Sequence, residues 1–211
     1  PAFVYGFWDR TQGILGATPE LLFRFVNDEN SIRMETMACA ATEDRQSPRL
    51  ISLMKDPKEL HEHTLVVQGM SESLAPLGKV SIGKLELLEL PKLAHLMTPI
   101  SVKLDMAPDF NAIVRALHPT PALGAFPREQ GMKWLREYQK KIDRKRYGAP
   151  VGFLHKSVQE SCCYVAIRNA QWNTQSISIG AGCGVVAESL LEREWAEVKL
   201  KIQAIKEILS L

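Results

Sequence analysis

The stretch "GAGCGVVAESLLEREWAEVKLK" (residues 180–201) joins a glycine-bearing turn to a segment whose periodicity predicts the last helix of the chain. Glu194, Glu197 and Lys201 fall within about 60° of one another on a 3.6-residue period. They border an apolar face made by Trp195, Val198, Ile202, Ile205 and Leu209. Two interpretations are open: an i,i+4 Glu-to-Lys pair on a solvated face, or acids held beside a ligand.

The turn before this helix carries Gly182 and Gly184. Glycines at such a place let backbone N–H groups approach an anion closely, near the positive end of a helix dipole. The segment matches neither a Walker loop nor the GxGxxG pattern, so a tight strand-to-helix turn is the competing interpretation.

The rest of the chain alternates groups of strands with groups of helices. Strands are predicted at residues 3–8, 21–25, 32–38, 79–90, 98–104, 150–155, 161–169 and 175–180. Helices are predicted after Ser47–Pro48, after Asp56–Pro57 as far as about Gly78, at 109–117, at 127–141 and from about 188. Strands on hairpin-length links, with helices grouped between them, indicate an α+β fold with antiparallel sheets.

The amino-acid composition indicates the cellular compartment and limits the classes of binding partner. With 211 residues, 45% of them hydrophobic, the chain suits one large domain or two closely packed halves. A net charge of +2 favours neither nucleic acid nor an anionic membrane as partner. The four cysteines show no CxxC spacing, and the sequence has no 18-residue apolar run and no signal-like start. We therefore expect a cytoplasmic protein without a zinc site or disulfide framework.

A second inward-facing acid lies in the helix predicted from about residue 57. Glu62 shares a stripe with Leu65, Val66, Gly69 and Met70. A carboxylate on an apolar face is costly unless a cation or hydrogen-bond donors compensate it. The flanking His61 and His63 are not an i,i+4 pair, so this is no HExxH zinc helix. Together with Glu194 and Glu197, Glu62 offers an all-oxygen ligand set of the kind that Mg²⁺ prefers.

Two other side chains could act on a ligand. Arg168 alternates with Tyr164 and Ala166 along a predicted strand, where its guanidinium could fork onto a carboxylate or form an ordinary ion pair. Glu20 follows Pro19 at a turn-to-strand junction. It could donate a proton if burial raised its pKa, and is otherwise a turn residue.

Taken in order, eight segments resemble the chorismate-utilising enzymes, a family that includes isochorismate synthase, salicylate synthase, anthranilate synthase component I and aminodeoxychorismate synthase component I. The segments are "GATPELLF" (16–23), "KELHEHTLVV" (58–67), "LAHLMTPI" (93–100), "LHPTPALGAFPRE" (117–129), "RYGAPVGF" (146–153), "AIRNA" (166–170), "GAGCGVV" (180–186) and "EREWAEVKLK" (192–201). They match the C-terminal half or so of a usual family member. By this resemblance residues 1–211 are the C-terminal portion of a chorismate-binding domain without its N-terminal half.

The segments "LHPTPA" and "EWAE" look like the isochorismate synthase branch, whose members serve menaquinone, siderophore or salicylate biosynthesis. The resemblance implies a two-lobed α/β sandwich, with helices outside antiparallel sheets, and Mg²⁺-dependent conversion of the small molecule chorismate to isochorismate. By position, the metal acids are Glu62, Glu194 and Glu197, and the general acid that protonates the departing C4 hydroxyl is Glu20, while water adds at C2. The substrate contacts implied are Arg168, Lys201, Gly182, Gly184 and His95.

Two of the departures from the family pattern concern catalysis and the substrate contacts. The family has a lysine base well upstream of the glutamate that matches Glu20, whereas the first lysine here is Lys55. Cys39 and Ala40 stand where the family has a glycine and a threonine. A non-catalytic relative that binds a ligand or partner, or another reaction on chorismate of the salicylate, anthranilate or aminodeoxychorismate synthase type, therefore remain alternatives. A bare half would also expose sheet edges, so we expect self-association or marginal stability of this chain.

Overall fold

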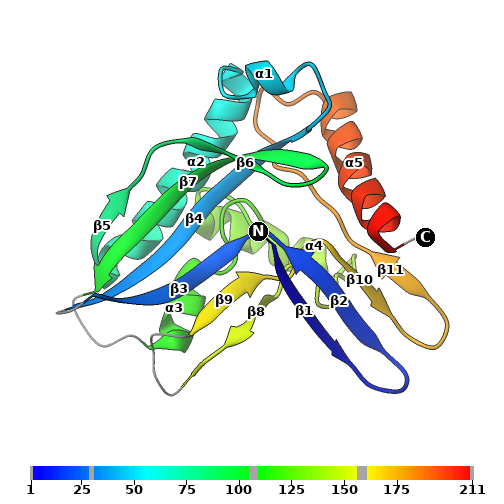
Figure 1. Cartoon of the computed structure of the whole chain (residues 1–211), viewed down its shortest axis with the longest axis horizontal. Helices are drawn as coiled ribbons and strands as arrows, with labels where there is room; N and C mark the ends of the chain where they lie inside the picture. Colours follow the sequence, from blue (N-terminus) through cyan, green and yellow to red (C-terminus); the bar gives the residue numbers. More distant parts are fainter. Residues whose placement is uncertain (1, 29–30, 105–108, 156–160, 210–211) are drawn as a thin grey trace.

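The chain is built on two antiparallel sheets. The computed structural model describes residues 2–28, 31–104, 109–155 and 161–209. One sheet has the order β1 (Phe3–Trp8), β2 (Gly13–Thr18), β10 (Asn169–Trp172), β11 (Ile177–Ile179). The other has the order β5 (Gly78–Ile82), β7 (Leu93–Leu104), β4 (Ser31–Asp44), β3 (Leu21–Asp28), β9 (Cys162–Val165), β8 (Pro150–Phe153), with β6 (Glu86–Glu89) also paired to β7. Figure 1 shows the four-stranded sheet on the right and the seven-stranded sheet on the left, which confirms the predicted α+β class.

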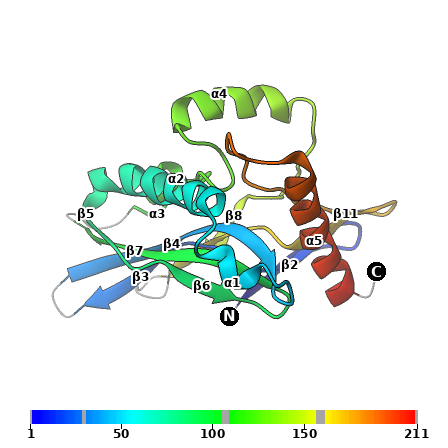
Figure 2. The same ribbon diagram turned by 90° about the horizontal axis from the view of Figure 1, so that it is seen from above.

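Five α-helices are present in the described part of the chain. They are α1 (Leu50–Leu53), α2 (Pro57–Leu74), α3 (Phe110–Leu117), α4 (Arg128–Gln139) and α5 (Leu191–Leu209). Helices α2, α4 and α5 lie on the same side of the sheets (Figure 2). None of the described helices combines the length and the apolar composition that crossing a bilayer requires.

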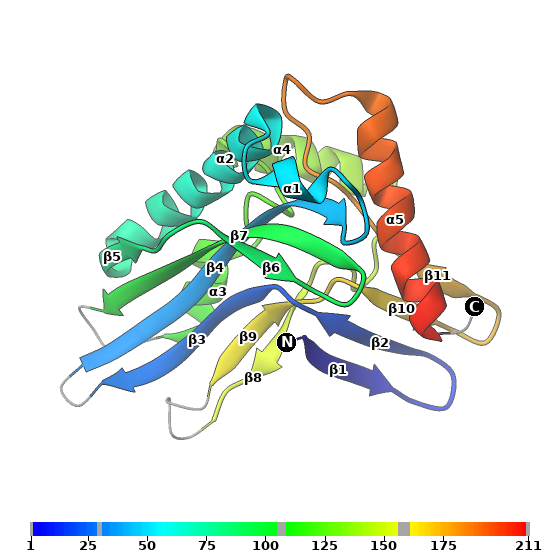
Figure 3. The ribbon, with the colours of Figure 1, turned by 45° about the horizontal axis from the view of Figure 1, so that its top comes forward.

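Helix α2 begins where local chemistry predicts. The carboxylate of Asp56 accepts hydrogen bonds from the backbone N–H groups of Lys58 and Glu59, and Pro57 occupies the first helical position. This cap fixes the first turn of α2, which carries Lys58 and Glu59 toward the site described below. In Figure 3, α2 covers the seven-stranded sheet and α5 descends toward β10 and β11.

The main core joins α2 and α3 to the seven-stranded sheet. Its buried members on the helices are Val66, Met70, Leu74, Ile113 and Leu117, and those on the strands include Leu22, Phe23, Phe25, Met34, Ile100, Val102 and Val165. Burying one such side chain stabilises the fold by about 1.5–3 kcal/mol. The packing holds α2 in a fixed position over β4, and so fixes the position of Glu62.

A bulge in β4 shapes the edge of the core next to the site. The pairing of β4 with β7 shifts register between Ala40 and Thr42, and Ala41 has a φ of 57°. Bulges of this kind re-aim side chains and carbonyl groups beside functional sites. Here the bulge turns the Ala41 carbonyl toward His95 of β7.

Three sequence predictions about strands were wrong. Residues 161–169 do not form a single strand, because β9 ends at Val165 and β10 begins at Asn169 in the other sheet. Arg168, with a φ of 53°, therefore lies in the connection between the two sheets. It does not alternate with Tyr164 and Ala166 along one strand, contrary to the prediction. The predicted strand 79–90 is divided into β5 and β6. Strand β2 was missed because its glycines indicate turns. Gly13 instead makes room for the Trp172 ring, which would lie 2.2 Å from a Cβ added at this position.

The helix predicted from Ser47 was also placed wrongly. Ser47 and Pro48 lie in a turn, in which the Ser47 hydroxyl accepts from the Arg49 N–H, and α1 begins only at Leu50. The four cysteines are free thiols, and Cys162 and Cys163 both lie in β9 as predicted.

Candidate functional site

A cavity of about 820 Å³ opens between the two sheets and helices α2, α4 and α5. Its volume lies within the range of about 300–1,000 Å³ that is usual for small-molecule sites. Eight of the nine site residues predicted from the sequence line it: Glu20, Glu62, His95, Arg168, Gly182, Gly184, Glu197 and Lys201. The ninth, Glu194, is buried and reaches the same region through Lys58. The structure therefore brings together residues that are as distant in the sequence as Glu20 and Lys201.

Glu20 lies at the corner between β2 and β3, and its side chain is buried. The residue is 8% exposed, and its Oε1 accepts a hydrogen bond of 3.2 Å from the Thr120 hydroxyl. Burial raises the pKa of Glu20 to about 7, although Thr120, Lys201 and Arg168 each act to lower it. A carboxyl group with this pKa is partly protonated at neutral pH and can donate a proton.

Arg168 and His95 form a connected pair in the cavity wall. The Arg168 Nη2 donates to His95 Nε2 at 3.2 Å, and since arginine has no acceptor, His95 Nε2 must carry the lone pair. The His95 proton is then on Nδ1, which donates to the Ala41 carbonyl at 3.0 Å. Burial, with Arg168 and Lys201 nearby, lowers the pKa of His95 to about 3, so the ring is neutral. His95 thus orients the guanidinium.

The other end of the Arg168 guanidinium has no partner among the residues that the structure describes. Its Nη1 is buried and makes no hydrogen bond within the described residues. Arg168 itself lines the cavity, and burial lowers its pKa without removing the charge that an arginine keeps in proteins. An oriented guanidinium with a free donor is suited to a carboxylate ligand.

An acid cluster lies between the first two turns of α2 and the first turn of α5, and we define it as Glu59, Glu62 and Glu194. The ammonium of Lys58 lies among all three, 2.8 Å from Glu194 Oε1, 2.9 Å from Glu62 Oε2 and 3.4 Å from Glu59 Oε1. Burial opposes its charge, but Glu194 and Glu62 outweigh burial and raise the pKa of Lys58. Burial and neighbouring carboxylates also raise the pKa of Glu59 to about 7, against the effect of Lys58.

Glu197 and Lys201 form the i,i+4 ion pair that the spacing predicts, at 2.5 Å. The pair is not on a solvated face: the two side chains are 10% and 16% exposed and line the cavity. Lys201 Nζ also donates to the Gly182 carbonyl at 2.8 Å, which ties the glycine turn to α5.

The apolar face predicted for α5 is only partly buried. The prediction was wrong for Trp195, which is 56% exposed and has the Lys199 ammonium over its ring. Ile205 is buried, as predicted.

Gly184 has a steric reason to be glycine. An added Cβ would lie 2.2 Å from Glu62 Oε1, whereas one added at Gly182 would meet nothing nearer than 3.8 Å. The close approach of the turn to Glu62 therefore depends on Gly184. No anion-binding role follows for either glycine from these contacts, and that role stays a prediction.

The donor set fits a divalent cation in its chemistry. Glu62, Glu194 and Glu197 present only oxygen ligands, and Glu194 Oε2 is buried with no partner among the described residues. Mg²⁺ prefers such hard oxygen ligands. As the described side chains stand, however, no three acids, histidines or cysteines are grouped at metal-binding distances. The carboxylates are instead spaced around the ammonium groups of Lys58 and Lys201.

Several residues of the site were not predicted. Lys58 and Glu59 were in a segment that resembles the family, and the i,i+4 spacing of Lys58 and Glu62 was the signal that could have revealed the pairing. Thr120, which contacts Glu20, and Tyr147, which lines the cavity, carried no such local signal. Burial raises the pKa of Tyr147.

The comparison with known proteins fits this geometry. The profile of the family described as "Chorismate binding enzyme" matches residues 1–210. The chain belongs to the chorismate-binding enzymes. This confirms the resemblance that the eight segments indicated.

Several isochorismate synthases are similar to this chain. The salicylate biosynthesis isochorismate synthase of Pseudomonas aeruginosa is 33% identical over 204 residues, which are 93% of this chain and 42% of that protein. Isochorismate synthase EntC of Escherichia coli (strain K12) is 30% identical over 206 residues, 94% of this chain and 51% of EntC. The solved structure of MenF, the menaquinone-specific isochorismate synthase of Escherichia coli, superposes on this chain with a TM-score of 0.83 at 26% identity. The superposition covers 97% of this chain and 48% of the MenF chain. The chain thus spans about half the length of these relatives.

Proposed function

We propose that these residues form the chorismate site of a Mg²⁺-dependent isochorismate synthase, in which water adds at C2 and the C4 hydroxyl departs. The observation that carries the proposal is Glu20, a buried acid whose pKa is raised to about 7, in a cavity that also holds the cations Arg168 and Lys201. The relatives that carry the name isochorismate synthase support the choice of reaction.

The cations of the cavity suit the charge of the substrate. Chorismate carries two carboxylates, and a buried guanidinium with a free donor can form a bidentate, charge-assisted pair with one of them. Arg168 is the candidate for that contact, because its Nη1 is unpartnered among the described residues and its Nη2 is held by His95. Lys201, which lines the same cavity and donates to the Gly182 carbonyl, supplies a second positive charge.

Glu20 acts as the general acid. Its proton goes to the oxygen of the C4 hydroxyl as the C4–O bond breaks, and the hydroxyl leaves as water. The Thr120 hydroxyl, 3.2 Å from Glu20 Oε1, holds the carboxyl group in place for this step. General acid catalysis of this kind contributes about 10²–10⁴-fold to a rate.

The water that adds at C2 must lose a proton to a base. The lysines that line the described cavity are Lys145 and Lys201, and Lys201 is ion-paired with Glu197. Lys145 is exposed to solvent. We place the base outside the described residues, in accord with the upstream lysine that the family resemblance implies.

The metal would be held by Glu62, Glu194 and Glu197. When bound, Mg²⁺ supplies positive charge that fixes and polarises a substrate carboxylate. The chain's part is to bring acids from α2 and α5 together, and the packing of Val66 and Met70 in the core holds α2 in place for this.

The test is chromatographic analysis of the products formed when chorismate is incubated with Mg²⁺ and the complete protein in which these residues occur. Isochorismate should form, EDTA should stop its formation, and Glu20→Gln should lower the rate by at least about 100-fold, the lower range for a general acid. EDTA-insensitive product formation, or full activity of Glu20→Gln, would contradict the proposal. Residues 1–211 alone should bind chorismate without turnover.

A second candidate is a relative that binds a ligand without catalysis. Cys39 and Ala40, which differ from the family pattern, both line the cavity, and burial raises the pKa of the Cys39 thiol to about 12. Ala40 lacks the hydroxyl of the threonine that the family has at its position, and the neutral Cys39 thiol is only a weak hydrogen-bond donor. The same chromatogram decides: a folded, complete protein that binds chorismate but yields no product is this relative, and salicylate, anthranilate or aminodeoxychorismate would identify another reaction of the family.

A further inference from the structure

The acid cluster contains its own cation. We propose that Lys58 stands in for the divalent metal in the metal-free protein, holding Glu62 and Glu194 together across α2 and α5, and that it competes with the metal for these two carboxylates. This inference rests on the proposed function, since it concerns the metal of that site.

The contacts of Lys58 explain how the cluster persists without a metal. The side chains of Glu59, Glu62 and Glu194 are 8–9% exposed, and that of Lys58 is 14% exposed. Three carboxylates so placed would be strongly unfavourable without a cation, because buried charges must be paired. Lys58 is within hydrogen-bond distance of both Glu62 and Glu194, and it therefore joins the two helices.

Distances show why ammonium and metal compete. Lys58 Nζ lies 2.9 Å from Glu62 Oε2 and 2.8 Å from Glu194 Oε1. Mg²⁺ holds its oxygen ligands at about 2.0–2.1 Å, so the carboxylates must close in on a metal and the ammonium must leave the point between them. Glu194 Oε2, which has no partner among the described residues, offers an incoming cation its first ligand.

The charge of Lys58 makes the competition electrostatic. A fixed positive charge within a few ångströms of a metal repels it, in addition to occupying its ligands. Removing this charge should therefore tighten metal binding, while it removes the interaction that holds the metal-free cluster together. A purely structural lysine would have only the second effect.

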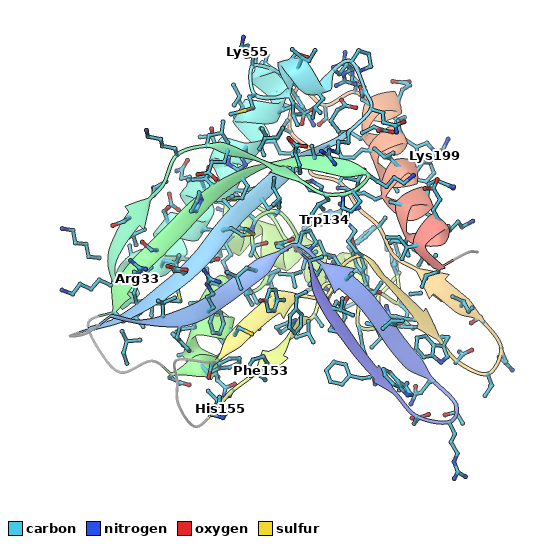
Figure 4. All side chains as sticks on the ribbon, viewed as in Figure 1. Arg33, Lys55, Trp134, Phe153, His155 and Lys199 are labelled. Atoms are coloured by element: carbon cyan, nitrogen blue, oxygen red, sulfur yellow. The ribbon has the colours of Figure 1, made fainter. Side chains whose placement is uncertain are left out.

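The experiment is calorimetric titration of the 211-residue chain with Mg²⁺, together with thermal unfolding in EDTA and in Mg²⁺. Lys58→Met should lower the melting temperature in EDTA, and should bind Mg²⁺ at least about ten times more tightly than the wild type, because the competing charge is gone. The matched control is Lys55→Met, which removes the same charge from an exposed lysine whose side chain points away from the molecule (Figure 4). Its Mg²⁺ affinity should equal that of the wild type.

A second measurement needs no variant. Amine-directed acetylation of the wild-type chain, read by peptide mass spectrometry, should modify Lys58 slowly in EDTA and faster in saturating Mg²⁺, with Lys55 modified equally in both. Equal Mg²⁺ affinities of wild type and Lys58→Met, or equal modification of Lys58 in both conditions, would overturn the proposed role of Lys58 and leave the proposed function intact. Absence of Mg²⁺ binding by every folded form would overturn the metal of the proposed function as well.

Discussion

Replacing Glu20 by glutamine should change how the stability of the chain depends on pH. Burial raises the pKa of Glu20 from its ordinary 4.5 to about 7 in the folded chain. Between these two values the folded state binds more protons than the unfolded state, so stability falls as pH rises through the window. At 1.36 kcal/mol for each pKa unit, the full effect is about 3 kcal/mol. A glutamine side chain at this position cannot titrate, so the variant lacks this loss.

Urea denaturation at half-unit steps from about pH 4.5 to 8 measures the effect. The free energy of unfolding of the wild type should fall by about 3 kcal/mol relative to that of Glu20→Gln across this range, with most of the change below pH 7. Glu129→Gln, which alters an exposed glutamate on α4, should follow the wild type at every pH. If the wild type and Glu20→Gln gave parallel profiles, Glu20 would not be the buried, neutral acid that the proposed chemistry requires.

Three other predictions concern the site and the assembly. Arg168→Met should weaken chorismate binding by about 10–100-fold in equilibrium dialysis, because a hydrogen bond to a charged group is worth about 1.5–3 kcal/mol; unchanged binding would remove Arg168 from the site. Gly184→Ala should lower both stability, by about 1–3 kcal/mol, and Mg²⁺ affinity, because its methyl group meets the Glu62 carboxylate, which Lys58 pins on its other side. Gly182→Ala, with 3.8 Å of space, is the control and should change neither quantity. Sedimentation velocity of the 211-residue chain should show concentration-dependent self-association, or thermal unfolding should show a broad transition at a low melting temperature. A monodisperse monomer that melts cooperatively would contradict this.

Helices with strong local signals could be predicted from the sequence. The starts of α2 and α3 follow Asp56 and Asp109, whose carboxylates accept from nearby backbone N–H groups, and α4 follows Pro127. Such caps are chemistry between neighbours in the chain, so they are visible in a window of a few residues. The sheet to which a strand belongs is not local. The segment from Cys162 to Trp172 is apolar throughout much of its length, yet it leaves one sheet and enters the other.

The candidate site was predictable in its members and less so in their contacts. Family resemblance selected residues that the fold then places around one cavity. The resemblance did not indicate that His95 accepts from Arg168, nor that Lys58 lies among three carboxylates, because both depend on side chains from different elements. Trp195 shows the same limit: its position on the helix suits burial, but no neighbouring element among the described residues covers it.

The proposed function requires that the cavity bind chorismate with the help of a divalent metal. Calorimetric titration of the folded 211-residue chain with chorismate, in Mg²⁺ and in EDTA, tests it most directly. We expect saturable binding of one chorismate to each chain in Mg²⁺, weakened at least about tenfold by EDTA, because the metal holds a substrate carboxylate. Saturable binding of the same strength in EDTA would contradict the metal site, and the absence of binding by folded protein in Mg²⁺ would contradict the assignment of the cavity.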